Sequence, residues 1–160
     1  MERHRDMITI GDLLQHGHVQ LEIKARQSND AIDEVAALVK TNPSVLDWEA
    51  LLKGVHASAP CLPEPAGGFA LCIPHTRGEC VNSMVMSVGR SETGVTFAGV
   101  ELPVRYIFCI AVPRALAADY LRIVGLLARV FKDRHTEGSL RAAVSEEEFI
   151  DLLTRREAKL

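Results

Sequence analysis

One segment of this chain constrains its fold more than any other, and it lies at residues 104–112. Its last part, residues 106–112, reads YIFCIAV and is apolar throughout, and Pro113 follows it. A strand with one face in water alternates apolar and polar residues, whereas a strand covered on both faces is apolar without interruption. Because proline cannot donate a hydrogen bond to a neighbouring strand, we expect the strand to end there. The sequence therefore predicts a central strand with a layer of structure packed on each face.

Other short segments have the pattern of strands. Residues 68–73 and 83–88 are mainly apolar and are bounded by glycine, proline or polar residues, and residues 19–23 alternate as a strand should. Helical patterns lie before and after this group of strands, so helices can cover both faces of a sheet. We therefore expect the α/β class, with a single mixed β-sheet of about four to five strands flanked by helices on both faces.

Capping residues and periodic apolar positions place helices in the first third of the chain. A short helical turn is expected at residues 10–14. Ser28 or Asn29 can cap a helix whose apolar face continues to Val39, and the Asn-Pro pair beyond it stops this helix. A second helix is expected at about residues 47–55.

Helices are also predicted in the C-terminal third of the chain. A long amphipathic helix follows Pro113, and its apolar residues recur at helical spacing. They are Leu116, Tyr120, Ile123, Val124, Leu127 and Val130. Two shorter helices should follow, and the second starts at a capping box formed by Ser145 and Glu148.

A histidine lies at the end of the strand predicted at residues 68–73. Residues 58–68 before it are too rich in proline and glycine for regular structure, and Pro74 should end the strand just before His75. We expect the chain to turn outward here, so that the imidazole meets solvent or a partner. Arg77 can then direct its guanidinium at a group that the imidazole carries. This pair suits phosphoryl chemistry, and the alternative is a loop-end histidine with no role.

Length and charge exclude several classes of protein. At 160 residues the chain is long enough for one domain with a full hydrophobic core. Its net charge of -3 lacks the basic excess of a nucleic-acid binder, so no nucleic-acid partner is expected. No stretch approaches the roughly 18–20 apolar residues of a membrane span, and the charged N-terminus does not have the apolar core of a signal peptide. We therefore expect a cytoplasmic protein with no membrane insertion.

The four cysteines are Cys61, Cys72, Cys80 and Cys109. Without an export signal, structural disulfides are not expected. Cys72 and Cys109 lie within apolar runs, where a free cysteine packs as a small hydrophobic residue. Cys72, His75 and Cys80 lack the paired spacing of a zinc module, so we expect no metal site. No base is identifiably paired with a cysteine, and a cysteine enzyme is the least favoured alternative.

The segment that contains His75 resembles part of a known protein family. Residues 70–77, ALCIPHTR, resemble the A-[IL]-P-H-[GAT]-[RK] strand end of phosphotransferase-system IIA domains of the fructose, mannitol and nitrogen-regulatory type. Three further segments, at residues 111–113, 120–131 and 140–149, follow in the family's order and spacing. The resemblance covers about residues 8–155, which we take as the domain, and residues 1–7 are expected to be a flexible N-terminus.

The resemblance implies a function for the histidine. In this family the histidine of the Pro-His pair receives a phosphoryl group from the carrier protein HPr and passes it on. His75 is thus implied to be the phosphoryl acceptor, with HPr or an HPr-like protein as donor and a IIB domain or a regulatory target protein as the next partner. Arg77 and Tyr120 are expected to line the same site. Transfer of a phosphoryl group from a phosphohistidine to another histidine needs no metal activation, so no cofactor is expected.

Two positions depart from the family pattern. Many members have a second histidine near the start of the long helix, where this chain has Tyr120. Its phenol can hydrogen-bond a phosphoryl group but cannot add positive charge. Many members also have an arginine just after the second helix, where this chain has Gly54. Among the remaining histidines, His56 is the one whose loop leads toward His75 and could fold over it.

Two functions of different class follow from the sequence. In the first, the protein is a phosphohistidine carrier, a phosphoryl-transfer component of a phosphoenolpyruvate-dependent phosphotransferase system. We expect a regulatory, nitrogen-type role rather than a sugar-dedicated one, because no transport or IIB segment is fused to the chain. In the second, the protein is a IIA-like regulatory adaptor that binds target proteins without efficient phosphotransfer. Phosphorylation of His75 would then be a switch or would be lost.

Overall fold

The computed structural model describes residues 7–63 and 68–160. The predicted flexible N-terminus at residues 1–7 lies outside these ranges except for Met7, and so does part of the predicted loop at 58–68. None of the helices in the described ranges is both long enough and apolar enough to cross a lipid bilayer.

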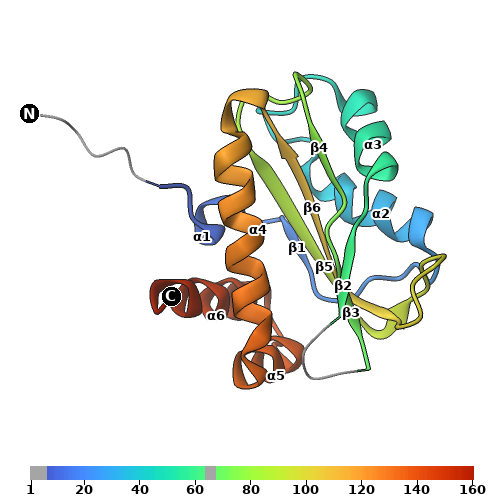
Figure 1. Cartoon of the computed structure of the whole chain (residues 1–160), viewed down its shortest axis with the longest axis vertical. Coiled ribbons are helices and arrows are strands. Elements are labelled where there is room, and N and C mark those ends of the chain that lie inside the picture. The colour runs from blue at the N-terminus through green and yellow to red at the C-terminus, as the bar shows by residue number, and fades with distance from the viewer. Residues whose placement is uncertain (1–6, 64–67) are drawn as a thin grey trace, which may run out of the picture.

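The strands of the described ranges form one mixed sheet of six strands (Figure 1). They are β1 Val19–Gln20, β2 Cys61–Pro63, β3 Ala70–Cys72, β4 His75–Arg77, β5 Val85–Val95 and β6 Val104–Val112. The order is β1-β5-β6-β3-β2, and β4 also pairs with β6. Strands β3 and β4 run parallel to β6, whereas β5 is antiparallel to β6 and β2 is antiparallel to β3.

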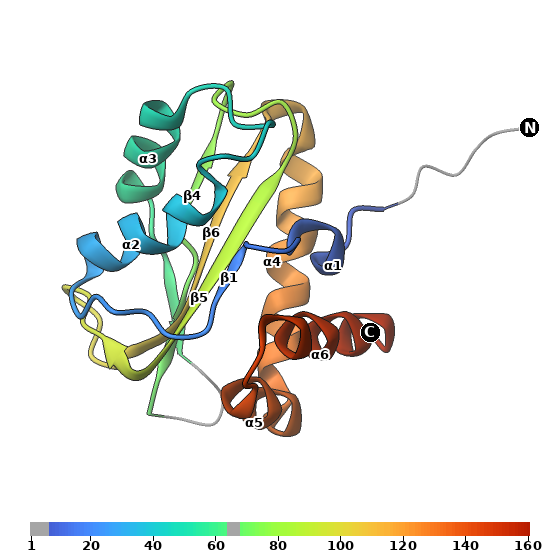
Figure 2. The same cartoon turned by 180° about the vertical axis from the view of Figure 1, so that it is seen from behind.

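Helices cover both faces of the sheet, as Figures 1 and 2 show from opposite sides. They are α1 Ile10–Leu13, α2 Ser28–Ala36, α3 Trp48–Ala57, α4 Ala117–Lys132, α5 Arg134–Ala142 and α6 Glu146–Ala158, with 3₁₀ turns η1 Ala37–Val39 and η2 Arg114–Leu116. Helices α2 and α3 pack on one face, and α1, α4, α5 and α6 pack on the other. The predicted α/β class and the mixed sheet between two layers of helices are confirmed.

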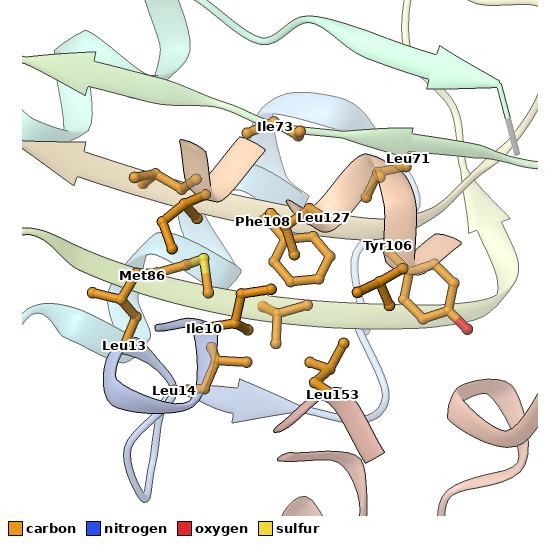
Figure 3. Close-up of a cluster of buried hydrophobic side chains, with 14 of the residues drawn as sticks. Ile10, Leu13, Leu14, Leu71, Ile73, Met86, Tyr106, Phe108, Leu127 and Leu153 are labelled. Atoms are coloured by element: carbon orange, nitrogen blue, oxygen red, sulfur yellow. The ribbon is translucent and has the colours of Figure 1, made fainter. Parts of the chain in front are cut away.

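Strand β6 contributes to two separate apolar cores. Every residue from Val104 to Val112 is buried. Tyr106 and Phe108 lie in the core beneath α1, α4 and α6 (Figure 3), whereas Ile107 and Cys109 lie in the core beneath α2 and α3. Neighbouring residues of a strand point to opposite faces, so an unbroken apolar sequence is what a strand between two cores requires.

Two strands differ in length from the prediction. Strand β1 keeps only two of the residues expected at 19–23, because the chain turns toward α2, where the Glu34 carboxylate accepts a hydrogen bond from the backbone of Lys24 at 2.8 Å. Strand β5 continues past the predicted end at Val88. The polar Arg90 is accommodated in β5 because its guanidinium donates to backbone carbonyl groups, including that of Leu140 at 2.7 Å.

The predicted capping residue of α6 is confirmed, whereas the prediction for α2 is wrong. Ser145 caps α6 as predicted, and its hydroxyl accepts a hydrogen bond from the Glu148 N–H at 3.1 Å. Neither Ser28 nor Asn29 caps α2, because that helix begins at Ser28 and its N-cap, Gln27, makes no side-chain cap bond. Instead, the Ser28 N–H donates to the Thr96 carbonyl at 3.1 Å, so a tertiary contact replaces the local cap.

A buried ion pair joins β6 to α5. The Arg105 Nη1 atom lies 2.6 Å from Glu137 Oε1, and the two side chains are only 4% and 2% exposed. Arg141 donates to the other carboxylate oxygen of Glu137 at 2.7 Å. Burial alone would raise the pKa of the Glu137 carboxyl, but the hydrogen bonds from Arg141 and Arg105 outweigh it and lower this pKa. Glu137 therefore carries the charge that makes the burial of Arg105 tolerable.

Removing the charge of Glu137 should strongly destabilise the fold. The substitution Glu137→Gln removes the buried carboxylate that Arg105 and Arg141 both contact, and we expect the free energy of unfolding to fall by about 3 kcal/mol. Urea unfolding followed by circular dichroism measures this loss. Glu147→Gln, an exposed position of α6, is the matched control and should cost at most a few tenths of a kcal/mol. Equal losses for the two variants would contradict the proposed importance of the buried pair.

The contribution of Glu137 should also depend on pH. Its pKa is lower in the folded state than in the unfolded state, so its stabilising effect is complete above the unfolded value of about 4.3 and is lost as the pH falls through the folded value. The difference in unfolding free energy between the wild type and Glu137→Gln should therefore be constant from about pH 7 to about pH 5.5 and should shrink below about pH 4. Urea titrations over this pH range test the sign, and a difference that grows at low pH would contradict it.

Candidate functional site

The chain does not leave the sheet at Pro74, contrary to the prediction. Cys72 pairs with Ile107 of β6, and His75 pairs with Ile110 of the same strand. The Pro74 carbonyl accepts a hydrogen bond from the Ile110 N–H at 2.9 Å. Proline lacks an N–H donor but keeps its acceptor, so pairing is interrupted and then resumes in the same register. His75 is therefore held in strand β4 and not in a loop.

The three predicted site residues line one cavity. His75 and Arg77 point to the same face of β4, since alternate residues of a strand share a face, and Tyr120 comes from the first turn of α4. The cavity has a volume of about 460 Å³. Its lining residues are Gly54, Ala57, Ser58, His75, Thr76, Arg77, Val112 and Tyr120. The structure thus brings together the residues that the sequence singled out.

Hydrogen bonds indicate which nitrogen of the His75 ring carries the proton. Its Nδ1 atom lies 3.0 Å from the Ile73 carbonyl oxygen. A carbonyl oxygen can only accept, so we assign the ring proton to Nδ1. Nε2 then keeps its lone pair and lies 3.4 Å from the Ser58 hydroxyl. The nitrogen available for nucleophilic attack is therefore Nε2.

Tyr120 packs against the His75 ring. The ring centroids are 5.0 Å apart and the ring planes are inclined by 34°. Partial burial raises the pKa of the Tyr120 phenol above its ordinary value. The hydroxyl group therefore keeps its proton at neutral pH and is available as a hydrogen-bond donor.

Ser58 is a site residue that the sequence did not reveal. Its carbonyl accepts the His75 N–H at 2.9 Å, in addition to the contact of its hydroxyl with Nε2. Residues 58–68 have the composition of an irregular loop, yet Cys61–Pro63 pairs with β3 as strand β2. This pairing brings Ser58 to His75. The proline-rich composition of this segment hides the strand pairing, and therefore also the contact, from a reading of the sequence.

Gly54 allows helix α3 to lie close to β4. It is inside α3 and not after it, and a Cβ atom at this position would lie 2.1 Å from Thr76 Oγ1. The arginine that many relatives are expected to have near this position would not fit there unless α3 moved. The absence of that arginine is therefore coupled to the packing of this helix against strand β4.

The structure also answers two other questions from the sequence, the position of His56 and the possibility of a metal site. His56 turns toward α2, where its Nε2 atom lies 2.6 Å from Asp33 Oδ1, so it does not fold over His75. Within the described residues, no three His, Cys, Asp or Glu side chains, including Cys72, His75 and Cys80, come together as a metal site.

The chemistry of the cavity suits an anion attached to the imidazole. The cavity that His75 lines also contains Arg77, Ser58 and Tyr120, which can supply a guanidinium and two hydroxyl groups. A guanidinium donates two parallel hydrogen bonds to a phosphate-like group, and hydroxyl groups can supply more. Such donors stabilise charge on the oxygens of a transferring group.

Comparison with known proteins identifies the family. Residues 12–156 match the family described as phosphoenolpyruvate-dependent sugar phosphotransferase system, EIIA 2. This range spans most of the 160 residues, and the chain therefore belongs to this family. It has the fold of EIIA-type domains, and the resemblance stated from the sequence is confirmed.

Two curated relatives are fructose-specific proteins. The chain is 30% identical over 87 residues to the fructose-specific EIIA component of Haloferax volcanii, a match that covers 54% of this chain and 56% of the relative. It is 24% identical over 153 residues to the fructose-specific EIIABC component of Bacillus subtilis, which covers 92% of this chain and 23% of the relative. The chain thus spans about half of the first relative and about a quarter of the second.

Solved structures share the fold. The nitrogen regulatory protein IIA-Ntr of Neisseria meningitidis is 25% identical and superposes with a TM-score of 0.75, covering 90% of this chain and 98% of that chain. The IIA mannitol protein of Escherichia coli, solved in complex with phosphorylated IIB, is 17% identical with a TM-score of 0.70, covering 88% of this chain and 96% of that chain. The second likeness shows the fold alone.

Adding a methyl group at Gly54 should disturb strand β4. The substitution Gly54→Ala forces α3 away from Thr76, and we expect it to lower the free energy of unfolding by about 1–3 kcal/mol, although alanine favours helix. Gly125→Ala in α4 is the matched control, because nothing lies within 4 Å of its added Cβ, and it should stabilise the chain by about 0.5–1 kcal/mol. Thermal unfolding measures both effects. If Gly54→Ala is as stabilising as Gly125→Ala, the close packing of α3 against β4 is refuted.

Proposed function

We propose that this protein is a phosphohistidine carrier of a phosphoenolpyruvate-dependent phosphotransferase system and that His75 Nε2 is the acceptor. The observation that carries the proposal is the pair of contacts on the ring. The Ile73 carbonyl accepts a hydrogen bond from Nδ1–H at 3.0 Å, which leaves one nucleophilic nitrogen facing a cavity with a cation and hydroxyl donors. HPr or an HPr-like phosphocarrier is the proposed donor.

The transfer step balances without an added cofactor. The His75 Nε2 lone pair attacks phosphorus, the Nε2–P bond forms, and the N–P bond of the donor's phosphohistidine breaks. The bonding electrons return to the donor imidazole, which takes up a proton from solvent. Both nitrogen–phosphorus bonds are of the same kind, so the step requires mainly positioning and neutralisation of charge.

Three side chains would share the work of positioning. Arg77 would bind two phosphoryl oxygens through its planar guanidinium. Tyr120 would donate its protonated hydroxyl, and the Ser58 hydroxyl would exchange its contact with Nε2 for one with the phosphoryl group. Packing of the Tyr120 ring at 5.0 Å from the His75 ring would restrict rotation of the imidazole.

The next partner is proposed from the relatives. A IIB domain is favoured by the solved mannitol complex of IIA with phosphorylated IIB. The fructose-specific relatives support a sugar-linked role, whereas the nitrogen regulatory relative supports a regulatory target. The regulatory, nitrogen-type role that the sequence predicts stays a prediction, as do the cytoplasmic location and the domain bounds at residues 8–155.

A labelling experiment tests the acceptor. The protein is incubated with phosphoenolpyruvate, enzyme I and HPr from its own source, and intact mass is recorded at neutral pH and after mild acid. We expect one acid-labile phosphoryl adduct, absent from His75→Ala. His135→Ala, an exposed histidine outside the cavity, is the control and should label like the wild type.

The same experiment separates the carrier from the adaptor. If the folded wild type does not label under conditions in which HPr is phosphorylated, the carrier proposal fails and a binding-only adaptor replaces it. If His75→Ala still labels, the acceptor has been placed on the wrong residue.

Arg77 should control the rate of labelling. Arg77→Gln removes the cation and both parallel donors, and we expect phosphorylation about 10- to 100-fold slower. Arg77→Lys keeps the charge but not the fork of donors and should give an intermediate rate. Rapid-quench measurement of the adduct gives these rates, with Arg155→Gln on α6 as the control for a lost surface charge. A rate for Arg77→Gln equal to that of the control would remove Arg77 from the site.

Tyr120 should act through its hydroxyl. Tyr120→Phe keeps the ring against His75 but loses one donor, and we expect labelling roughly three- to tenfold slower with unchanged thermal stability. The lifetime of the isolated phosphorylated protein should shorten as well, because one hydrogen bond to the phosphoryl group is missing. Unchanged rate and lifetime in Tyr120→Phe would show that the hydroxyl takes no part.

A further inference from the structure

Two cysteines face each other at the edge of the sheet, beside the acceptor strand. Cys61 of β2 and Cys72 of β3 are direct partners in the antiparallel pair. The adjacent pair carries the hydrogen bond, because the Ile73 N–H donates to the Pro60 carbonyl at 2.9 Å. Antiparallel partners alternate between hydrogen-bonded and non-hydrogen-bonded pairs, so the two cysteines occupy a non-hydrogen-bonded pair.

This position has the geometry that a disulfide needs. Cα atoms of a non-hydrogen-bonded antiparallel pair lie about 4.5 Å apart, within the range of about 4.4–6.8 Å in which disulfides occur. Both thiols also lie close to the same backbone carbonyl group. Cys61 Sγ lies 3.7 Å and Cys72 Sγ lies 3.3 Å from the Ala59 carbonyl oxygen. The sulfur atoms can therefore be joined with little movement of the backbone.

The two thiols differ in reactivity and access. Cys61 is half-buried on the edge strand, whereas Cys72 is buried. The interaction with Cys72 lowers the pKa of the Cys61 thiol, against the opposing effect of burial. The interaction with Cys61, together with burial, raises the pKa of the Cys72 thiol. Cys61 is thus the thiol that an oxidant reaches first as thiolate, and Cys72 is the thiol placed to resolve it.

We infer that Cys61 and Cys72 form a reversible redox-modification site, at which a hydroperoxide produces an intramolecular disulfide. The Cys61 thiolate attacks the peroxide oxygen, the O–O bond breaks, and Cys61 becomes a sulfenic acid. The departing alkoxide or hydroxide takes a proton from solvent and leaves as an alcohol or water. Cys72 sulfur then attacks Cys61 sulfur, and the hydroxyl group leaves as water with the Cys72 proton. Two electrons pass from the two thiols to the peroxide.

The disulfide would tighten the framework of the acceptor cavity. Cys61 lies three residues after Ser58, and Cys72 lies three residues before His75. The His75 N–H donates to the Ser58 carbonyl at 2.9 Å, so the linked cysteines and the cavity are parts of one strand pair. Joining the strands opposes their separation, because cross-linked segments gain less freedom when they open. This inference does not depend on the phosphocarrier role.

Oxidation of the intact chain tests the inference. The fully reduced protein is treated with hydrogen peroxide in slight excess, and intact mass and peptide mapping are recorded. We expect loss of two hydrogen atoms, one cross-linked peptide that joins Cys61 to Cys72, and full reversal by dithiothreitol. Cys61→Ser should not lose two hydrogen atoms. A pair that remains reduced, links to a second chain, or proceeds to sulfinic acid at Cys61 would overturn the inference.

Hydrogen exchange of the wild type gives a second readout that needs no variant. The backbone amides of Ile73 and His75 both donate to the segment that leads into β2. We expect these amides to exchange at least about tenfold more slowly in the oxidised form. Amides of α6, remote from the cysteines, should exchange at the same rate in both forms. Equal exchange of Ile73 and His75 in the two forms would contradict the coupling to the acceptor strand.

Discussion

The pairing of β6 with two successive segments, β3 and β4, determines how the rest of the structure is arranged. The register is kept across Pro74, since Cys72 is opposite Ile107 and His75 is opposite Ile110. Strand β6 is buried along its whole length between two apolar cores. A segment paired with such a strand cannot shift by one residue without moving every side chain to the other face. His75 therefore occupies a fixed position between α3 and α4, although its backbone lies next to a proline.

A fixed histidine suits a carrier that must accept a group and then release it. The Ile73 carbonyl holds one ring nitrogen, so only Nε2 is open to the cavity. The proposed surroundings contain one cation, Arg77, and neutral hydroxyl groups. A second histidine in place of Tyr120 could add positive charge, whereas the phenol adds only a hydrogen bond. The phosphoryl group would then be held with less charge, which favours its transfer to the next partner.

The sequence predicted the parts of this protein that depend on local pattern. The apolar run of β6, the amphipathic periodicity of α4 and the Ser145 cap each appear in the structure as expected. Strand β2 was missed, because its segment is rich in proline and has the composition of a loop. The contact of Ser58 with His75 follows from the pairing of this segment with β3. Strand β3 ends before Pro74 as predicted, but the expected outward turn was wrong, because the proline carbonyl still accepts a hydrogen bond and pairing with β6 resumes at His75.

The central claim is that the Nε2 atom of His75 accepts the phosphoryl group. The most direct test is nuclear magnetic resonance of the protein with ¹⁵N-labelled histidine, phosphorylated through HPr. Long-range ¹H–¹⁵N correlation spectra distinguish the two ring nitrogens and show which one is bonded to phosphorus. We predict that only the Nε2 resonance of His75 shows phosphorus coupling and that Nδ1 keeps its proton. Phosphorylation at Nδ1, or at another residue, would contradict this account of the site.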